Sequence, residues 1–155
     1  MPNTFVYGID ISQICINLAN KNKIKNKINN AEFVLSDLFE NLKFNFKFDL
    51  IVANPPYISE TEFKDLAPSI KLWEDKKALV APDNGLEIIE KIISQAKNYI
   101  NINSELKKLG LNQIYIEIGA GQGQQVKELF HKNNFSNITI IKDLNRKDRV
   151  VSAGV

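Results

Sequence analysis

The sequence predicts an α/β fold with a mostly parallel sheet that helices cover on both faces. Short apolar segments typical of buried strands alternate along the chain with segments whose apolar residues recur at helical spacing. A chain of 155 residues is long enough for one domain with a hydrophobic core and too short for two comfortable ones. We therefore expect residues 1–155 to form a single domain.

The N-terminal residues predict the first strand and helix. Residues 5–9 are extended-type and end at Asp10, and Ser12 is a suitable N-cap for the helix that follows. Asp10 fits two roles equally well, as a carboxylate that binds a ribose or as a helix-start residue that interacts with the macrodipole. The helix carries four apolar residues on one face, which predicts a buried Cys15 thiol: Ile14, Cys15, Leu18 and Ala19.

Two further strands follow, and each leads to a polar side chain. Residues 33–35 form a short strand before Asp37, and the apolar run 48–53 ends at Asn54. Asp10 ends the first strand in the same way. Because ligands of open α/β sheets bind at the carboxyl ends of the strands, we expect these three side chains to converge on one edge.

The tetrapeptide Asn54-Pro55-Pro56-Tyr57 is the strongest functional signal. Pro55 and Pro56 cannot donate to a strand ladder, and Pro55 forces Asn54 into an extended conformation. The turn offers a carboxamide, a rigid Pro55 carbonyl and an aromatic ring, which suit a planar substrate group that bears nitrogen. An isolated Asn-Pro is most simply turn chemistry, but the strand before it and the tyrosine after it favour a functional site.

The second half of the chain continues the alternation. The polar residues 59–77 are a candidate substrate-facing loop or lid, and residues 84–100 show the spacing of a helix with one buried face. Residues 104–110 are predicted to be a loop. The remaining elements are a strand at 114–118, a glycine-rich turn, a helix containing Val126, Leu129 and Phe130, and strands at 138–141 and 150–151.

Composition excludes several classes of function. A net charge of +2 without a long basic cluster gives no case for a nucleic-acid partner. No Cys or His cluster supports a metal site, no apolar run is long enough to span a membrane, and the N-terminus is not that of a signal peptide. The single cysteine excludes an internal disulfide and fits a reducing compartment, so we expect a cytoplasmic protein.

The tetrapeptide Asn54-Pro55-Pro56-Tyr57 resembles the signature of the amino-methyltransferases, S-adenosylmethionine enzymes that methylate planar nitrogens of adenine, cytosine or glutamine. The chain as a whole resembles the HemK/PrmC family, which methylates a glutamine side chain in peptide chain release factors. The matching pieces cover nearly all of the chain in the family's order: residues 8–12 (GIDIS), 36–39 (SDLF), 54–58 (NPPYI), 78–80 (ALV) with 84–86 (NGL), and 117–119 (EIG) with 122–123 (QG).

This resemblance implies a class I S-adenosylmethionine-dependent methyltransferase with a Rossmann-like sheet. By the resemblance, Asp10 and its neighbour Ile11 would bind the ribose of the cofactor, and Asp37 with Leu38 would border its adenine. Asn54 would lie at the methyl end of the cofactor. S-adenosylmethionine is therefore the expected cofactor.

The same resemblance implies that the loop formed by Asn54, Pro55, Pro56 and Tyr57 is catalytic. It would hold the glutamine amide, with the Asn54 side-chain oxygen and the Pro55 carbonyl accepting the two amide hydrogens and Tyr57 packing on the planar group. A release factor is the protein substrate that the resemblance implies.

Two features depart from the family pattern. The family usually has Glu-Pro ahead of its Ala-Leu pair, whereas Glu74 is followed here by Asp75. Family members also begin with a helical substrate-recognition domain, a central strand and a glycine-rich turn for the methionine part of the cofactor, but only nine residues precede Asp10. We therefore expect a domain truncated at the N-terminus, which a separate N-terminal half could complete, and weak or absent activity of the chain alone.

Two alternatives stay open. Gly119, Gly121, Gly123 and the later Asp143 have the spacing of a dinucleotide fingerprint, which would suit a permuted adenine or cytosine amino-methyltransferase acting on nucleic acid. The charge and the lack of a DNA-recognition segment argue against it, and the family alignment explains the glycines as a late strand-to-helix turn. The other alternative is a non-catalytic fragment or subunit of a split methyltransferase.

Overall fold

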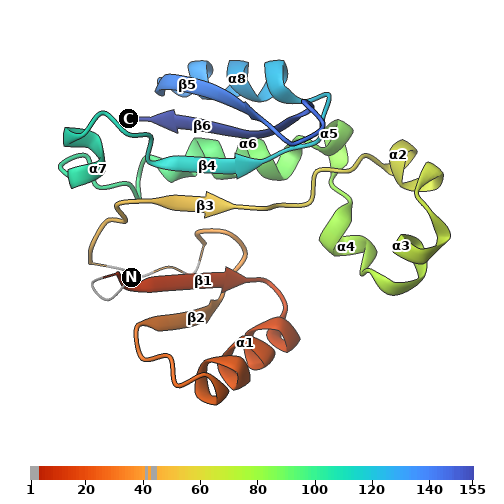
Figure 1. Ribbon diagram of the computed structural model, residues 1–155, viewed down its shortest axis with the longest axis horizontal. Coiled ribbons are helices and arrows are strands. Elements are labelled where there is room, and N and C mark those ends of the chain that lie inside the picture. Colours follow the sequence, from red (N-terminus) through yellow and green to blue (C-terminus); the bar gives the residue numbers. More distant parts are fainter. Residues whose placement is uncertain (1–3, 41, 43–44) are drawn as a thin grey trace. The chain divides into compact units, whose positions relative to one another are not determined.

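The computed structural model describes residues 4–40, 42 and 45–155, which divide into two compact units, Met1–Asn45 and Phe46–Val155. The single-domain organisation stays a prediction. The first unit is a β-α-β motif in which two strands pair in parallel (Figure 1). In this pair Asp10 lies opposite Leu35. Its elements are β1 (Val6–Asp10), α1 (Gln13–Lys25) and β2 (Ala31–Leu35).

Helix α1 begins where the sequence predicts and buries a different face. The Ser12 hydroxyl accepts a hydrogen bond from the Cys15 backbone N–H at 3.4 Å, as an N-cap does. Ile16 is the buried residue of the helix, whereas Ile14, Cys15 and Leu18 are exposed. The prediction of a buried Cys15 thiol is therefore wrong, because the helix packs on β1 and β2 through the Ile16 side.

The second unit contains a four-stranded sheet with the order β3-β4-β6-β5. Its strands are β3 (Ile51–Ala53), β4 (Ile114–Glu117), β5 (Ser136–Lys142) and β6 (Asp148–Gly154). Strands β3 and β4 are parallel, as predicted, but β6 is antiparallel to both of its neighbours. A short turn joins β5 to β6, and such a turn permits only antiparallel pairing, so this sheet is mixed.

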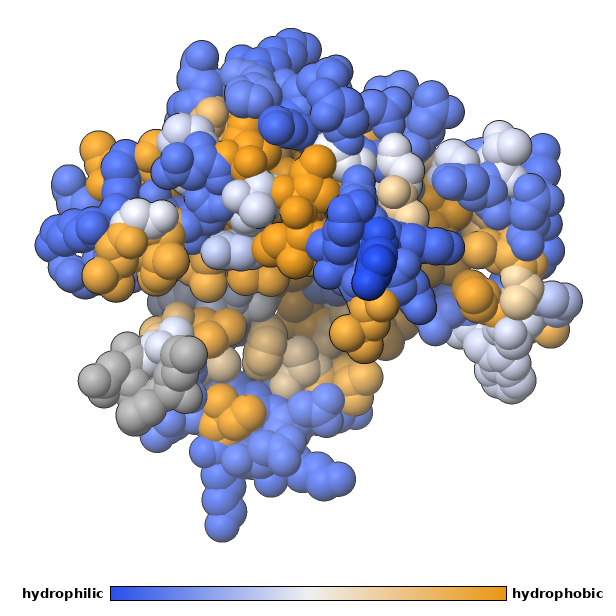
Figure 2. All heavy atoms as spheres, turned by 45° about the horizontal axis from the view of Figure 1, so that its top comes forward, coloured by the Kyte–Doolittle hydropathy of each residue, from blue (hydrophilic) through white to orange (hydrophobic). Residues whose placement is uncertain are grey.

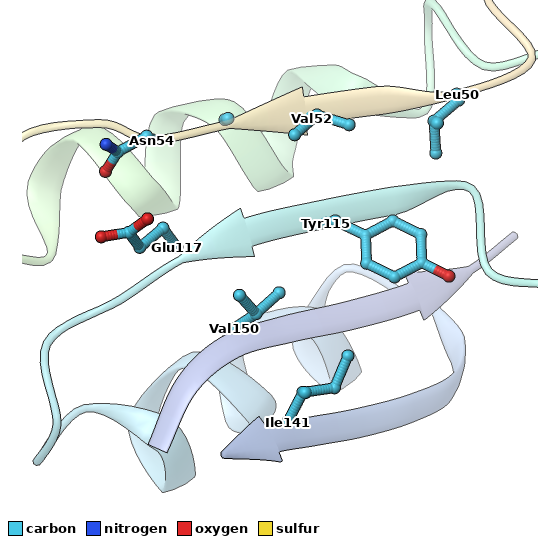
Figure 3. A pocket seen from close by; sticks show the side chains of 8 residues that line it. Leu50, Val52, Asn54, Tyr115, Glu117, Ile141 and Val150 are labelled. Carbon is cyan, nitrogen blue, oxygen red and sulfur yellow. The ribbon is translucent and has the colours of Figure 1, made fainter. Parts of the chain in front are cut away.

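One face of this sheet carries the hydrophobic core of the second unit. Helices α6 (Glu87–Ala96) and α8 (Gly123–Lys132) lie on that face (Figure 3). The predicted helical spacing is confirmed there, and the buried side chains are Ile89, Ile92, Ile93 and Ala96 of α6, Val126 and Phe130 of α8, and Ile114, Ile116, Val151 and Ala153 of the sheet.

The opposite face of this sheet is open in the described part of the second unit. Val52 at the centre of β3 is 72% exposed, and Leu50 just before β3 and Ile141 on β5, at the other edge of the sheet, are exposed as well. Hydrophobic side chains are correspondingly visible at the surface over the second unit in Figure 2. The sequence predicted helices on both faces of the sheet. Within the second unit, α6 and α8 cover one face.

Between β3 and α6 the chain forms short helices in place of the predicted loop or lid: α2 (Glu60–Asp65), α3 (Pro68–Trp73), α4 (Lys76–Leu79) and α5 (Pro82–Gly85). The predicted loop at 104–110 contains another, α7 (Glu105–Lys108). Within α5, Asp83 and Asn84 have positive φ angles of 50° and 53°, so this element is a left-handed turn before α6. Among the described residues no helix is long and apolar enough to cross a membrane.

Candidate functional site

Asn54 lies at the carboxyl end of β3, next to the end of β4. The register pairs Ala53 with Ile116, so Asn54 and Glu117 are the next residues of two neighbouring parallel strands. Adjacent strands are separated by about 4.8 Å, which brings the two side chains within reach of one small group. Figure 3 shows the carboxamide and the carboxylate projecting from these strand ends on the same side of the sheet.

Both side chains line a cavity of about 460 Å³ on the open face of the sheet. Asn54 and Glu117 lie at one end of it, the Tyr115 hydroxyl lies towards the other, and the rest of the wall is largely apolar. The lining residues are Leu50, Val52, Ala53, Asn54, Tyr115, Glu117, Ile141 and Val150. A cavity of this kind can hold a flat organic group against the strand ends.

The turn after Asn54 is held firmly at its far end. Pro55 is buried, while Asn54 itself is exposed. Ile58 donates its backbone N–H to the Leu79 carbonyl at 3.0 Å, and its own carbonyl accepts the Ala81 N–H at 3.0 Å. The stiff prolines and this bridge to the chain after α4 leave the asparagine side chain accessible on a rigid support.

The Tyr57 hydroxyl is fixed between a carboxylate and a guanidinium group. It donates to Glu117 Oε1 at 3.0 Å and accepts from Arg149 Nη1 at 3.2 Å. Arg149 also approaches Glu117 Oε1 at 3.9 Å and Asp143 Oδ2 at 3.5 Å. The tyrosine ring of the predicted catalytic loop is thereby tied to β4 and β6.

Burial raises the pKa of Tyr57 above its ordinary value of 10.0, and the hydrogen bond and charge of Glu117 raise it further, while Arg149 opposes the shift. Folding stability that depends on the neutral phenol is thus fully present below the ordinary pKa and is lost as the pH rises through the higher folded value. In a spectrophotometric titration, Tyr57→Phe is expected to remove tyrosinate absorbance that develops above about pH 10. Absorbance lost only below that pH would contradict the raised pKa.

The side chain of Gln122 holds the backbone of the same loop by hydrogen bonds. Its Nε2 donates to the Tyr57 carbonyl at 2.9 Å and the Asn84 carbonyl at 3.0 Å, and its Oε1 accepts the Gly119 N–H at 2.8 Å. The side chain is buried, so these bonds are shielded from water. A Cβ on Gly85 would lie 2.0 Å from the Tyr57 carbonyl oxygen, which explains a glycine at that position.

Sequence reasoning found the loop and missed the residues that support it. The sequence pointed to Glu117 and Gln122 as pieces of a family match and did not point to Arg149. The signal for Glu117 was available, because it ends a buried strand as Asn54 does. Arg149 gave no signal, since it contacts Tyr57 across 92 positions of the sequence.

The predicted cofactor residues of the first unit lie at one edge of its sheet. Asp10 ends β1, Asp37 follows β2 by two residues, and the Ser36 N–H donates to the Asp10 carbonyl at 3.1 Å. Ile11 is exposed, and Leu38 adopts a positive φ of 47°. Asn54 belongs to the second unit, and the convergence of all three polar side chains stays a prediction.

The Asp10 carboxylate has the chemistry for the ribose of a cofactor. It lines a cavity of about 250 Å³ in the first unit together with Gly8, and its Oδ1 accepts the Ser12 N–H at 2.7 Å. A carboxylate has about four acceptor sites, so it can still accept hydroxyl donors. The helix-start role and the ribose role that the sequence left open are therefore compatible.

The glycines after β4 form a strand-to-helix turn. Gln122 donates its backbone N–H to the Gly119 carbonyl at 3.0 Å, and α8 begins at Gly123. Asp143 belongs to the turn between β5 and β6, where the Lys147 N–H lowers the pKa of its carboxyl below the ordinary value. Strand β6 separates β5 from β4, so the adjacent-strand arrangement of a dinucleotide fingerprint is absent from this sheet. The described residues contain no group of three or more His, Cys, Asp or Glu that could hold a metal ion.

Comparison with solved structures identifies the fold. A ribosomal protein L11 methylase of Lactobacillus delbrueckii subsp. bulgaricus matches with a TM-score of 0.58 and 19% identity, over 96% of this chain and 56% of that chain. A Streptococcus mutans protein solved in complex with SAH matches with a TM-score of 0.55 and 14% identity, over 96% of this chain and 74% of that one. The predicted class I methyltransferase fold with a Rossmann-like sheet is confirmed.

Curated relatives agree with the resemblance found in the sequence. Release factor glutamine methyltransferases of Fusobacterium nucleatum and Francisella tularensis are each 40% identical to this chain over 99% of its length, which covers 41% and 50% of those proteins. The chain thus spans about half the length of the curated relatives it matches. The sequence profile of the methyltransferase small domain matches residues 1–136, and the chain belongs to this methyltransferase family.

Proposed function

We propose that this chain is the catalytic part of an S-adenosylmethionine-dependent enzyme that methylates the side-chain amide of a glutamine in peptide chain release factors. The observation that carries the proposal is the accessible Asn54 carboxamide on its proline-anchored turn, beside Glu117 at the end of a neighbouring strand. The names of the curated relatives support the choice of a release factor as substrate. The single cysteine fits a cytoplasmic location for such an enzyme.

An amide nitrogen is a poor nucleophile because its lone pair is delocalised into the carbonyl. The Asn54 oxygen and the Pro55 carbonyl would accept the two amide hydrogens and fix the nitrogen in line with the methyl donor. The Tyr57 ring, held by Glu117 and Arg149, would pack on the planar amide. When bound, S-adenosylmethionine supplies a methyl group on a positively charged sulfur.

The proposed cofactor residues are Asp10 and Ile11 for the ribose, Asp37 and Leu38 for the adenine, and Asn54 at the methyl end. Residues 1–45 contain a single glycine, Gly8, and Gly119 after β4 already donates its N–H to the Gln122 side chain that binds the Tyr57 carbonyl. A further segment would therefore supply the glycine-rich turn, either as a separate N-terminal half or as part of a longer chain. The exposed apolar face of the β3-β4-β6-β5 sheet is a surface that such a segment could cover.

The test is a chimera in which this chain replaces the matching 153 residues of the Fusobacterium nucleatum relative. With labelled S-adenosylmethionine and a purified release factor, the chimera is expected to transfer one methyl group to a glutamine, located by mass spectrometry. Transfer to nucleic acid in place of the release factor would favour the adenine or cytosine alternative. Cofactor binding without any transfer would favour the non-catalytic alternative.

Cofactor binding supplies a control that does not depend on the acceptor. Calorimetry on the chimera is expected to show that Asp10→Ala weakens S-adenosylmethionine binding about 10- to 100-fold, the cost of a hydrogen bond to a charged group. Asp143→Ala, which alters the turn between β5 and β6, is expected to leave binding unchanged. The reverse result would move the cofactor to the glycines after β4 and contradict the proposed site.

A further inference from the structure

The proposed roles of the Asn54 loop leave Glu117 without a chemical role of its own. It is the residue beside Asn54 in the β3-β4 register, and its carboxylate lines the same cavity. Its side chain is 34% exposed, so the carboxylate can be reached from the cavity. A group held by the Asn54 carboxamide would therefore lie next to a carboxylate.

The partners of Glu117 hold the carboxylate in place and leave some of its hydrogen-bond acceptor sites unused. Oε1 accepts the Tyr57 hydroxyl at 3.0 Å, and Arg149 lies 3.9 Å away. A carboxylate offers about four acceptor sites, so capacity for a further donor remains. Arg149 is shared with Asp143, and the cluster of two carboxylates and one guanidinium carries a net negative charge. The site is thus poised for a neighbouring positive charge.

Methylation of an amide creates that positive charge. The nitrogen lone pair forms the new N–CH₃ bond while the S–CH₃ bond breaks, and the sulfur keeps the electron pair of the broken bond as a neutral thioether. The nitrogen then carries a positive charge and one hydrogen too many, and it must lose a proton to give the neutral N-methyl amide. A fixed carboxylate beside the nitrogen stabilises the charge, and it can take the proton once one amide hydrogen leaves the acceptor, Asn54 or Pro55, that held it before methyl transfer.

We propose that Glu117 is a catalytic residue of this site and accepts the proton that leaves the glutamine amide nitrogen during methyl transfer. The inference rests on the proposed function. Its partly exposed carboxylate can pass the proton to solvent, which returns the group to its starting state. Arg149 and the Tyr57 hydroxyl act as positioning groups that keep the carboxylate at the strand end.

Glu117→Gln in the active chimera tests the proposal, because the glutamine oxygen can still accept the Tyr57 hydroxyl while the charge and the proton acceptor are lost. We expect kcat to fall about 10²-fold or more, the usual contribution of a proton-transfer group, with little change in the KM for S-adenosylmethionine. Glu128→Gln on the exposed side of α8 is the matched control, with an expected kcat equal to that of the parent.

Tyr57→Phe separates catalysis from positioning, since it removes the hydroxyl and leaves the carboxylate. We expect a smaller loss of kcat for this variant than for Glu117→Gln. A parent-like rate in Glu117→Gln combined with a large loss in Tyr57→Phe would overturn the proposal, because Glu117 would then only orient the tyrosine.

Glu117→Ala with added formate is the second test, in case the glutamine variant folds poorly. Recovery of kcat on addition of formate supports Glu117 as the proton acceptor, and no recovery in a folded variant contradicts it. Parent activity on the release factor tests the proposed function separately.

Discussion

Asn54→Ala is expected to lower kcat for glutamine methylation by the chimera about 10²- to 10³-fold, the cost of removing one hydrogen-bonding group that is preorganised for a transition state. The carboxamide oxygen can no longer hold an amide hydrogen, so the nitrogen loses its alignment with the methyl donor. The other acceptor, the Pro55 carbonyl, belongs to the backbone and survives the change. The measurement is kcat under saturating S-adenosylmethionine and release factor.

The same variant is expected to keep the fold. Asn54 is exposed and follows the last residue of β3, so its truncation should change the free energy of unfolding by no more than about 0.5 kcal/mol. Asn103→Ala, at an exposed loop position, is the matched control and is expected to leave both the rate and the stability unchanged. Parent-like activity of Asn54→Ala with a normal unfolding curve would remove this residue from the site.

Local chemistry made the positions of the site residues predictable. Two prolines end β3 just before Asn54 whatever surrounds them, and the Ser12 cap and the spacing of Ile89 and Ile93 likewise depend on near neighbours. Such signals act over one or two turns of chain. The sequence therefore predicted the turn after Asn54, the strand ends and the buried face of α6.

Contacts between residues far apart in the sequence were not predicted, because the signals in the sequence are local. Gln122 reaches the Tyr57 carbonyl across 65 positions, and Arg149 reaches the Tyr57 hydroxyl across 92. No local pattern encodes which distant backbone group a buried amide will satisfy. The antiparallel direction of β6 was missed because only two of its seven residues were predicted as strand. The exposure of Cys15 was missed because helical spacing defines a face without stating what covers it.

Gly85→Ala is expected to be the most destabilising small change near the site. Gly85 has a φ of +81°, and an added Cβ would lie 2.0 Å from the Tyr57 carbonyl oxygen and 2.8 Å from Gln122 Nε2. The backbone around Tyr57 would have to move, and the hydrogen bond from Gln122 to the Tyr57 carbonyl would be strained or lost. Gly110→Ala is a matched control, because Gly110 has a similar φ of +71° and a Cβ added there would have no such heavy atom within 4 Å.

The difference between the two alanine variants isolates the steric contact from the cost of a left-handed backbone. We expect Gly85→Ala to lower the free energy of unfolding by about 1–3 kcal/mol more than Gly110→Ala, as overpacking does in a tight site. In the chimera, Gly85→Ala should also reduce kcat, since Tyr57 and the prolines before it shift together, whereas Gly110→Ala should not. Equal losses in denaturant unfolding and in kcat would mean that the loop tolerates the methyl group. The close packing of Gly85, Tyr57 and Gln122 would then have no part in holding Asn54 in place.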